Sequence, residues 1–191
     1  SEIYFDTPPL GGLEAAMTLG RDDFANLVMF TSLSKRSNVP GMRSGFVAGD
    51  ARVLEKFLLY RTYHGSAMSP TVQAASVAAW ADEAHVIENR RLYADKFAAV
   101  TPIVAAALSV SRPEAGFYLW AKVAGDDAVF ARELLRQENV TVLPGSYLGR
   151  TAQGSNPAAG YIRIALVAPL AECVEAAERI ARFAATMTTS A

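Results

Sequence analysis

Short apolar runs separated by polar segments predict strands in the first part of the chain. The runs at 27–31 and 45–49 are typical of buried strands. Residues 1–6 contain a strand-like segment, Ile-Tyr-Phe, and predict a strand fragment. The stretch 32–45 (Ser-Leu-Ser-Lys-Arg-Ser-Asn-Val-Pro-Gly-Met-Arg-Ser-Gly) has no period, so we expect a polar loop between two buried strands.

Helical spacing dominates the next part of the chain. Residues 51–63 carry apolar side chains three and four positions apart, which predicts a helix with Asp50 as its N-cap. The pair Ser69-Pro70 predicts a second helix start, with serine as the cap and proline in the first turn. A longer helical pattern begins at residue 82 or 83 and runs to about Leu108, and Pro102 predicts a kink or break in it.

Strand and helix patterns alternate again after residue 111. Alternation over 161–167 directs Ile162, Ile164 and Leu166 toward a core. A helix over 126–139 is expected to turn three large side chains inward, those of Phe130, Leu134 and Leu135. Further strands are predicted at 116–123 and 140–143, and a further helix at 170–187.

These patterns predict three parts. We expect a first part over 1–85, a connecting helix over 86–111, and a separate α/β lobe over 112–191.

The composition narrows the class of protein. The chain has 191 residues, of which 51% are hydrophobic and 19% charged, with a formal net charge of −1. These values fit a globular protein and give no basic stripe for nucleic acid. One cysteine excludes a disulfide within the chain, two histidines are too few for an ordinary zinc site, and no metal is expected. No apolar run is long enough for a membrane span and no signal peptide is recognisable, so a cytoplasmic location is the default expectation.

The polar stretch carries the chemistry of the first half. Lysine reacts with carbonyl compounds when its imine is stabilised, as with pyridoxal phosphate (PLP). Serine hydroxyls and an arginine fork donate hydrogen bonds to a phosphate. We therefore predict that Lys35 is the catalytic lysine and carries PLP. Ser32, Ser34 and Arg43 are predicted to hold its phosphate, with glycines at 41 and 45 allowing Arg43 to point back.

The same residues carry a family resemblance. Ser-Leu-Ser-Lys followed by Pro-Gly-Met-Arg-Ser-Gly resembles the PLP-lysine signature of class I/II aminotransferases, the aspartate aminotransferase superfamily. Ser32, Lys35 and Arg43 match that signature at its offsets. The resemblance implies an α/β chain with part of the PLP-dependent transferase fold type I. In that fold, 1–85 would be the C-terminal part of the large PLP-binding domain and 112–191 the small C-terminal domain.

Two further motifs extend the resemblance into the second half. Tyr-Ile-Arg-Ile-Ala at 161–165 resembles the family strand whose arginine binds the substrate α-carboxylate, which makes Arg163 a substrate-binding candidate. Gly-Phe-Tyr-Leu-Trp at 116–120 resembles a strand near the substrate mouth and makes Tyr118 another, although core aromatic side chains explain this motif equally well.

A narrower resemblance points to one substrate class. The segment 57–70, together with the lysine stretch, looks like the bacterial succinyldiaminopimelate aminotransferases of lysine biosynthesis. The resemblance implies transfer from glutamate to a succinylated 2-amino-6-oxopimelate, in a homodimer with shared active sites. The loop after residue 60 would then reach the partner's site through Arg61, Tyr63, His64 or Ser66.

The resemblance also implies a longer protein. The family's Asp-x-x-Tyr pattern, which binds the cofactor ring, precedes the segment that resembles residues 1–4, and no such pattern precedes Lys35 here. We expect this chain to be the C-terminal half of the enzyme and to be inactive alone. Alternatives are another class I/II aminotransferase, a PLP β-lyase, or a non-catalytic regulator domain with the same fold.

Overall fold

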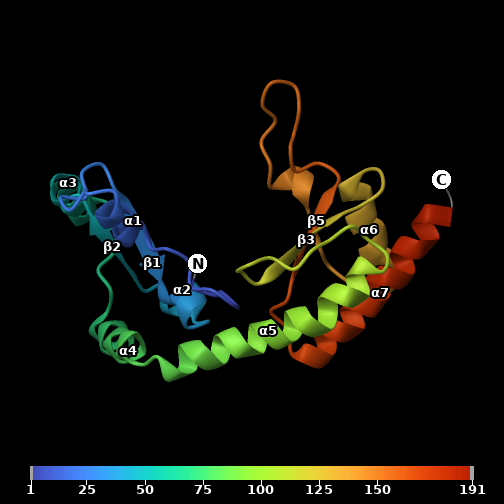
Figure 1. Ribbon diagram of the computed structural model, residues 1–191, viewed down its shortest axis with the longest axis horizontal. Coiled ribbons are helices and arrows are strands. Elements are labelled where there is room, and N and C mark those ends of the chain that lie inside the picture. The colour runs from blue at the N-terminus through green and yellow to red at the C-terminus, as the bar shows by residue number, and fades with distance from the viewer. Residues whose placement is uncertain (1, 190–191) are drawn as a thin grey trace. The chain divides into compact units, whose positions relative to one another are not determined.

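The computed structural model describes residues 2–189 and divides the chain into two compact units, Ser1–Arg90 and Arg91–Ala191. The boundary falls inside the long helix α5, Ala84–Ala105 (Figure 1). This helix lies mostly within the segment predicted to connect two domains. Pro102 is inside α5, and the helix ends three residues later.

The first unit combines one antiparallel strand pair with short helices. Strands β1 and β2 pair from Val28↔Gly49 to Ser32↔Gly45. Both strands and the helix after them have the bounds expected from the apolar runs, to within a residue. The elements of this unit are α1 Gly12–Thr18, β1 Val28–Ser32, α2 Leu33–Arg36, the 3₁₀ helix η1 Pro40–Met42, β2 Gly45–Gly49, α3 Ala51–Tyr63 and α4 Pro70–Ala81.

The two predicted helix caps are confirmed. Asp50 caps α3, and its carboxylate accepts a hydrogen bond from the backbone N–H of Arg52 at 2.9 Å. The hydrogen bonds from the Arg52 side chain and from the backbone N–H of Asn26 hold the pKa of Asp50 far below its usual range. Ser69 caps α4 by accepting from the N–H of Val72 at 3.3 Å.

The prediction that the two strands are buried is wrong. The side chains of Phe30 and Phe46 are 67% and 47% exposed. Phe30 contacts Phe57 of α3 edge-on at 6.0 Å, and Phe46 contacts Trp80 of α4 at 5.0 Å, so each ring is covered on one side. Each phenylalanine ring is contacted by one aromatic residue of one helix, and this is too little apolar surface to bury the strand pair on both of its faces. Residues 2–6 form bends around a single β-bridge position at Tyr4 and not the expected strand.

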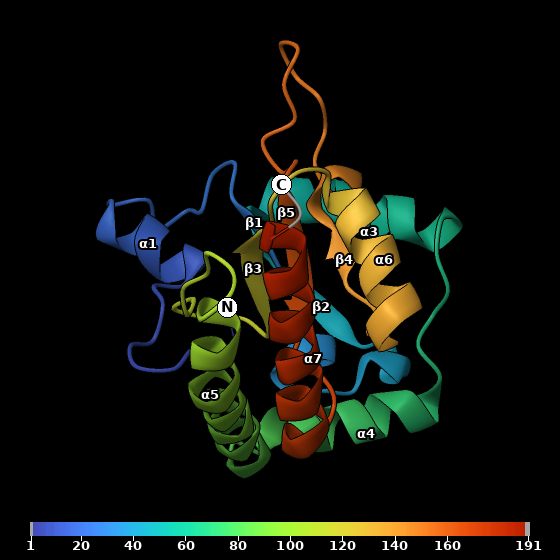
Figure 2. The ribbon, with the colours of Figure 1, turned by 90° about the vertical axis from the view of Figure 1, so that its right-hand side faces the viewer.

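The second unit is a three-stranded antiparallel sheet with helices on one face. The strand order is β3-β5-β4, so β5 is central. Figure 2 shows α6 and α7 in front of this sheet, and both helices contribute to its core. Phe130 of α6 and Phe183 of α7 meet edge to face at 5.0 Å. The elements are β3 Tyr118–Lys122, α6 Asp127–Glu138, β4 Leu143–Pro144, η2 Gly145–Tyr147, β5 Tyr161–Ala165 and α7 Leu170–Thr189.

Most of the predicted core of this unit is confirmed, with one error. Ile162, Ile164 and Leu166 are buried, as are Phe130 and Leu134. The prediction for Leu135 is wrong, because its side chain is 47% exposed. One helical step turns a side chain by about 100°, which carries the residue after a buried one away from the core. Of the predicted strand at 140–143, only Leu143 lies in a strand, as the first residue of β4.

Across residues 2–189, no helix combines the length and apolar content that crossing a membrane requires.

Candidate active site

Lys35 lies on a single helical turn, α2, where the sequence predicted a loop. Leu33 and Arg36 occupy the inward side of this turn and are 0% and 5% exposed, whereas Lys35 is exposed. The backbone N–H of Leu33 donates to the carbonyl of Ser44 at 3.0 Å, which ties the start of the turn to the segment entering β2. The turn therefore presents the lysine on one side and is anchored on the other.

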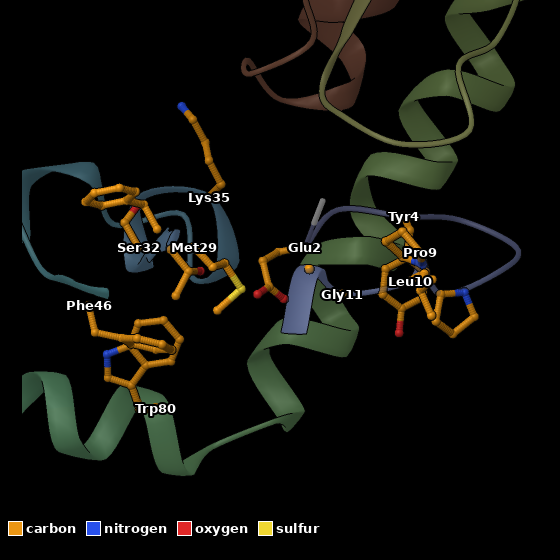
Figure 3. Close-up of a pocket in the computed structure, with 14 residues that line it drawn as sticks. Glu2, Tyr4, Pro9, Leu10, Gly11, Met29, Ser32, Lys35, Phe46 and Trp80 are labelled. Atoms are coloured by element: carbon orange, nitrogen blue, oxygen red, sulfur yellow. The ribbon is translucent and has the colours of Figure 1, made fainter. Parts of the chain in front are cut away.

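A pocket of about 790 Å³ opens beside this turn, and Lys35 and Ser32 line it together (Figure 3). Phe46 and Trp80 form an aromatic wall with ring centroids 5.0 Å apart. Figure 3 shows the Lys35 side chain extending away from that wall. The remaining lining comes from β1 and the N-terminal segment: Glu2, Tyr4, Pro8, Pro9, Leu10, Gly11, Gly12, Met29, Phe30 and Thr31.

The other two predicted phosphate ligands stand apart from this pocket. Ser34 and Arg43 are not among the residues that line it. Arg43 is exposed, and its Nη1 donates to the carbonyl of Pro40 at 2.9 Å. That bond uses one of the five N–H donors of the guanidinium.

The backbone turn after the lysine is made differently from our expectation. Arg43 itself adopts the left-handed conformation, with φ of 52°. Gly41 lies in η1, and a Cβ there would meet nothing within 4 Å. Gly45 is needed for a close approach, since a Cβ at this position would lie 2.4 Å from the carbonyl oxygen of Thr31. The left-handed conformation of Arg43 is uncommon for a non-glycine residue, and such residues are often found at functional sites.

The donor set around the pocket fits an aldehyde cofactor that carries a phosphate. Lys35 supplies a primary amine, and Ser32 supplies a hydroxyl that does not cap α2, so it remains available to a phosphate oxygen. The pocket volume lies in the range of small-molecule sites, roughly 300–1,000 Å³. No group of three or more His, Cys, Asp or Glu side chains in the described part of the chain is arranged to hold a metal ion.

The second unit carries Arg163 on its central strand. Trp120 of β3 and Leu143 of β4 lie opposite Arg163 in the register, so the three side chains share one face of the sheet. The guanidinium carbon of Arg163 lies 5.4 Å from the ring centroid of Tyr118. Trp120 stacks on Tyr161 with centroids 5.5 Å apart. This face, opposite the helices, holds a half-buried arginine among aromatic rings.

A tight turn supports that face. A Cβ on Gly145 would lie 2.2 Å from the carbonyl oxygen of Ala158 and 2.9 Å from the indole of Trp120. The buried carboxylate of Asp127 accepts from the backbone N–H of Ser146 at 2.6 Å. The turn thus sets the position of the indole next to Arg163.

The family model for aminotransferase class I and II matches residues 6–180. The chain belongs to this aminotransferase family. An aminotransferase structure from Neisseria meningitidis is 62% identical, with a TM-score of 0.88, over 94% of this chain and 46% of that one. The probable aminotransferase Rv1178 of Mycobacterium tuberculosis is 34% identical over 87% of this chain and 38% of its own length. A probable N-succinyldiaminopimelate aminotransferase from Thermus thermophilus is 26% identical, with a TM-score of 0.81. The match covers 95% of this chain and 47% of that one.

Two conclusions follow from these comparisons. The chain has the α/β fold of aminotransferases related to aspartate aminotransferase, as the lysine signature predicted. It spans about half the length of the solved aminotransferases and less than half of the curated relative.

The loop after α3 is ordered by its own side chains in this aminotransferase chain. Arg61 Nη2 donates to the carbonyl of Ser66 at 3.2 Å. Its guanidinium also occupies the space where a Cβ on Gly65 would lie, at 2.2 Å. His64 stacks on Tyr60 with centroids 4.6 Å apart, and Tyr63 is 81% exposed. All four loop residues singled out from the sequence are exposed: Arg61, Tyr63, His64 and Ser66.

Sequence reasoning missed the aromatic wall and its support. In the sequence Phe46 lies in a predicted strand and Trp80 in the helix predicted after Ser69-Pro70, and neither pattern indicates a site. Arg36 directly follows the lysine but is not part of the family signature. The one local signal was the placement of Arg36 three residues after Leu33, which puts both on the same side of a helical turn.

Proposed function

We propose that the complete protein is a PLP-dependent aminotransferase that exchanges an amino group between glutamate and an oxo acid. The observation that carries this proposal is that Lys35 and Ser32 line the same pocket in a chain that belongs to this family. When bound, PLP supplies the electron sink that stabilises negative charge at the substrate α-carbon.

Lys35 has two proposed tasks. Lys35 would hold the cofactor through its Nζ, and the same amine would carry a proton to and from the substrate α-carbon. Ser32 would hold the phosphate from the pocket lining, and Ser34 and Arg43, which are not among the lining residues, would reach the phosphate from outside it. Because α2 presents Lys35 to the pocket and buries its other side, the amine is supported by the fold and not by a mobile loop.

Arg163 is the proposed ligand of the substrate α-carboxylate. A guanidinium matches a carboxylate in two-point geometry, and its half-buried place on the sheet strengthens the charge interaction. Tyr118 packs against this guanidinium and limits its orientation.

The proposed amino acid substrate is N-succinyl-LL-2,6-diaminopimelate, with 2-oxoglutarate as the amino acceptor in the reverse direction. This proposal is supported by the sequence of the lysine stretch and segment 57–70, and by the similarity to the T. thermophilus protein. We further propose a homodimer in which the loop holding Tyr63 and His64 serves the partner's site. Light scattering of the full-length protein should give the molar mass of a dimer. A monomer that retains activity would contradict the proposed homodimer.

Substitution of Lys35 tests the activity. Full-length Lys35→Ala protein should lose both transamination and the visible absorbance of the lysine-bound cofactor. Lys56→Ala is the matched control, because Lys56 is an exposed lysine on α3 paired with Glu55. Absorbance that persists in Lys35→Ala and disappears in another lysine variant would refute the assignment.

Product analysis tests the reaction and the substrate. N-succinyl-LL-diaminopimelate should yield glutamate from 2-oxoglutarate faster than unmodified LL-diaminopimelate or aspartate does. Release of ammonia and pyruvate from a suitable amino acid, without a new amino acid, would identify a β-lyase instead.

Arg163→Ala should raise KM for both the donor and the acceptor, since both carry the α-carboxylate. Lys122→Ala is the control, because Lys122 is an exposed cation opposite Tyr161 on the same face. An increase confined to one substrate would contradict the shared role.

A further inference from the structure

The turn that carries Lys35 cannot hold its own shape. Helix α2 has four residues, Leu33–Arg36, and a single helical turn is unstable in water without tertiary contacts. Its geometry must therefore come from residues that tie it to the rest of the unit. Besides Leu33, the turn buries one more side chain, that of Arg36.

Arg36 makes three contacts with the end of α4 and the junction that follows. Its Nη1 donates to the carbonyl of Ala79 at 2.9 Å, and its Nη2 donates to the carboxylate of Glu83. Its guanidinium carbon lies 5.0 Å from the ring centroid of Trp80. Arginine is seldom buried to this extent unless it is paired, and here the pairing fixes the direction of the side chain.

Trp80 links this contact to the pocket. The indole interacts with the Arg36 guanidinium and also contacts Phe46, and both aromatic residues line the pocket with Lys35. One side chain therefore holds the back of the lysine turn and braces the aromatic wall of the same pocket.

A second tether acts at the next residue. Ser37 ends α2, and its hydroxyl is 2.7 Å from Nε2 of His85. Nδ1 of the same ring is 2.6 Å from the carboxylate of Asp82. Both residues that follow Lys35 are thus tied to the junction between α4 and α5.

We propose that Arg36 is a positioning residue for Lys35. It fixes the lysine turn and the Trp80 wall in one arrangement, so that the amine of Lys35 meets the cofactor aldehyde at a defined place. The inference rests on the proposed function, because it assigns Arg36 a task in the same site. It acts through the backbone of α2 and through Trp80, without touching the cofactor.

Capture of the cofactor by Lys35 tests this role apart from catalysis. Full-length protein without cofactor is mixed with PLP, and the adduct is fixed by borohydride at a series of times. Peptide mass spectrometry then measures the labelling of Lys35 relative to Lys56 in the same sample. Only folded protein isolated by size-exclusion chromatography is labelled, because unfolded chains would label both lysines alike and lower the ratio.

We expect Arg36→Met to lower the Lys35 labelling rate at least tenfold relative to Lys56. The Lys35 labelling rate of Arg36→Lys should lie between those of the wild type and Arg36→Met. Lysine keeps the charge but lacks the forked guanidinium that reaches Ala79 and Glu83 together. Arg136→Met is the matched control, since Arg136 is an exposed arginine paired with Glu133 on α6, and it should match the wild type.

The outcomes separate this inference from the proposed function. Absence of Lys35 labelling in the wild type would defeat the proposed function itself. Wild-type labelling in Arg36→Met would overturn the positioning role and leave the function standing. If Arg36→Met does not fold, Glu83→Gln gives the answer, because Glu83 is exposed and its change removes only the charged partner. Glu83→Gln should slow Lys35 labelling severalfold, and an unchanged ratio would overturn the inference.

Discussion

Two neighbouring leucines on α6 should respond very differently to truncation. Leu134 is fully buried, whereas Leu135 is 47% exposed. The two positions share one helix and one residue type, so the change in helix propensity on going to alanine is the same for both. The difference between Leu134→Ala and Leu135→Ala therefore isolates packing beneath the sheet that carries Arg163.

The magnitude follows from burial. Truncation of a fully buried leucine removes its transfer free energy and leaves a cavity, at a cost of roughly 2–5 kcal/mol. Full burial of a leucine side chain contributes about 1.5–3 kcal/mol, so a half-exposed one contributes about 1 kcal/mol and leaves no closed cavity. The free energy of unfolding should thus fall by about 2 kcal/mol more in Leu134→Ala than in Leu135→Ala.

Urea unfolding of the full-length protein, followed by circular dichroism, measures this difference. With a slope of about 2 kcal/mol/M, the midpoint of Leu134→Ala should lie about 1 M below that of Leu135→Ala. Equal slopes for the two variants serve as the control that the same surface is exposed on unfolding. A midpoint shift for Leu135→Ala as large as that for Leu134→Ala would refute the assignment of the buried face.

Three further predictions concern the first unit and α7. Gly45→Ala should lower the free energy of unfolding by about 1–3 kcal/mol, because its Cβ meets a carbonyl oxygen across the strand pair, while Gly41→Ala should be nearly neutral by the same urea assay. The hydrogen bond from His85 lowers the pKa of Asp82, so Asp82 stabilises the fold above its unfolded pKa. Asp82→Asn should therefore be less stable than the wild type at pH 6, and this difference should shrink as the pH falls below about 4; a gap that widens there would contradict the assignment. Burial raises the pKa of the Cys173 thiol, so it should react with a disulfide reagent at pH 8 only after unfolding, and rapid native labelling would count against it.

Local chemistry accounts for what the sequence predicted well. The caps at Asp50 and Ser69 use backbone N–H groups two and three residues ahead, so each is visible in a short stretch of sequence. The alternation over 161–167 reports burial because one face of that sheet is covered by helices. The same reasoning failed for the strands that hold Phe30 and Phe46, because an apolar run does not show how much of the chain is available to cover it.

At the lysine site, too, the residues near one another in the sequence were predicted better than the backbone geometry. The signature around Lys35 is contiguous, and it led to Lys35 and Ser32, which share a pocket wall. It could not show that Arg43 takes the left-handed conformation itself, since glycine is the usual residue for that task. Gly41 and Gly45 were the expected turn residues, but Asn38 and Arg43 are the ones in this segment with a left-handed backbone.

Arg36 shows why the support of a site is harder to predict than the site. Its polar partners lie 43 and 47 residues further along the chain, and its tryptophan lies between them. In the sequence this arginine is indistinguishable from an exposed cation in a polar loop, which is the ordinary state of arginine. Its burial has meaning only together with the end of α4, because burying the charge without that carbonyl, carboxylate and ring would be strongly unfavourable. A four-residue helix bearing a reactive lysine needs such a contact, and the chain supplies it from the end of α4, more than 40 residues away in the sequence.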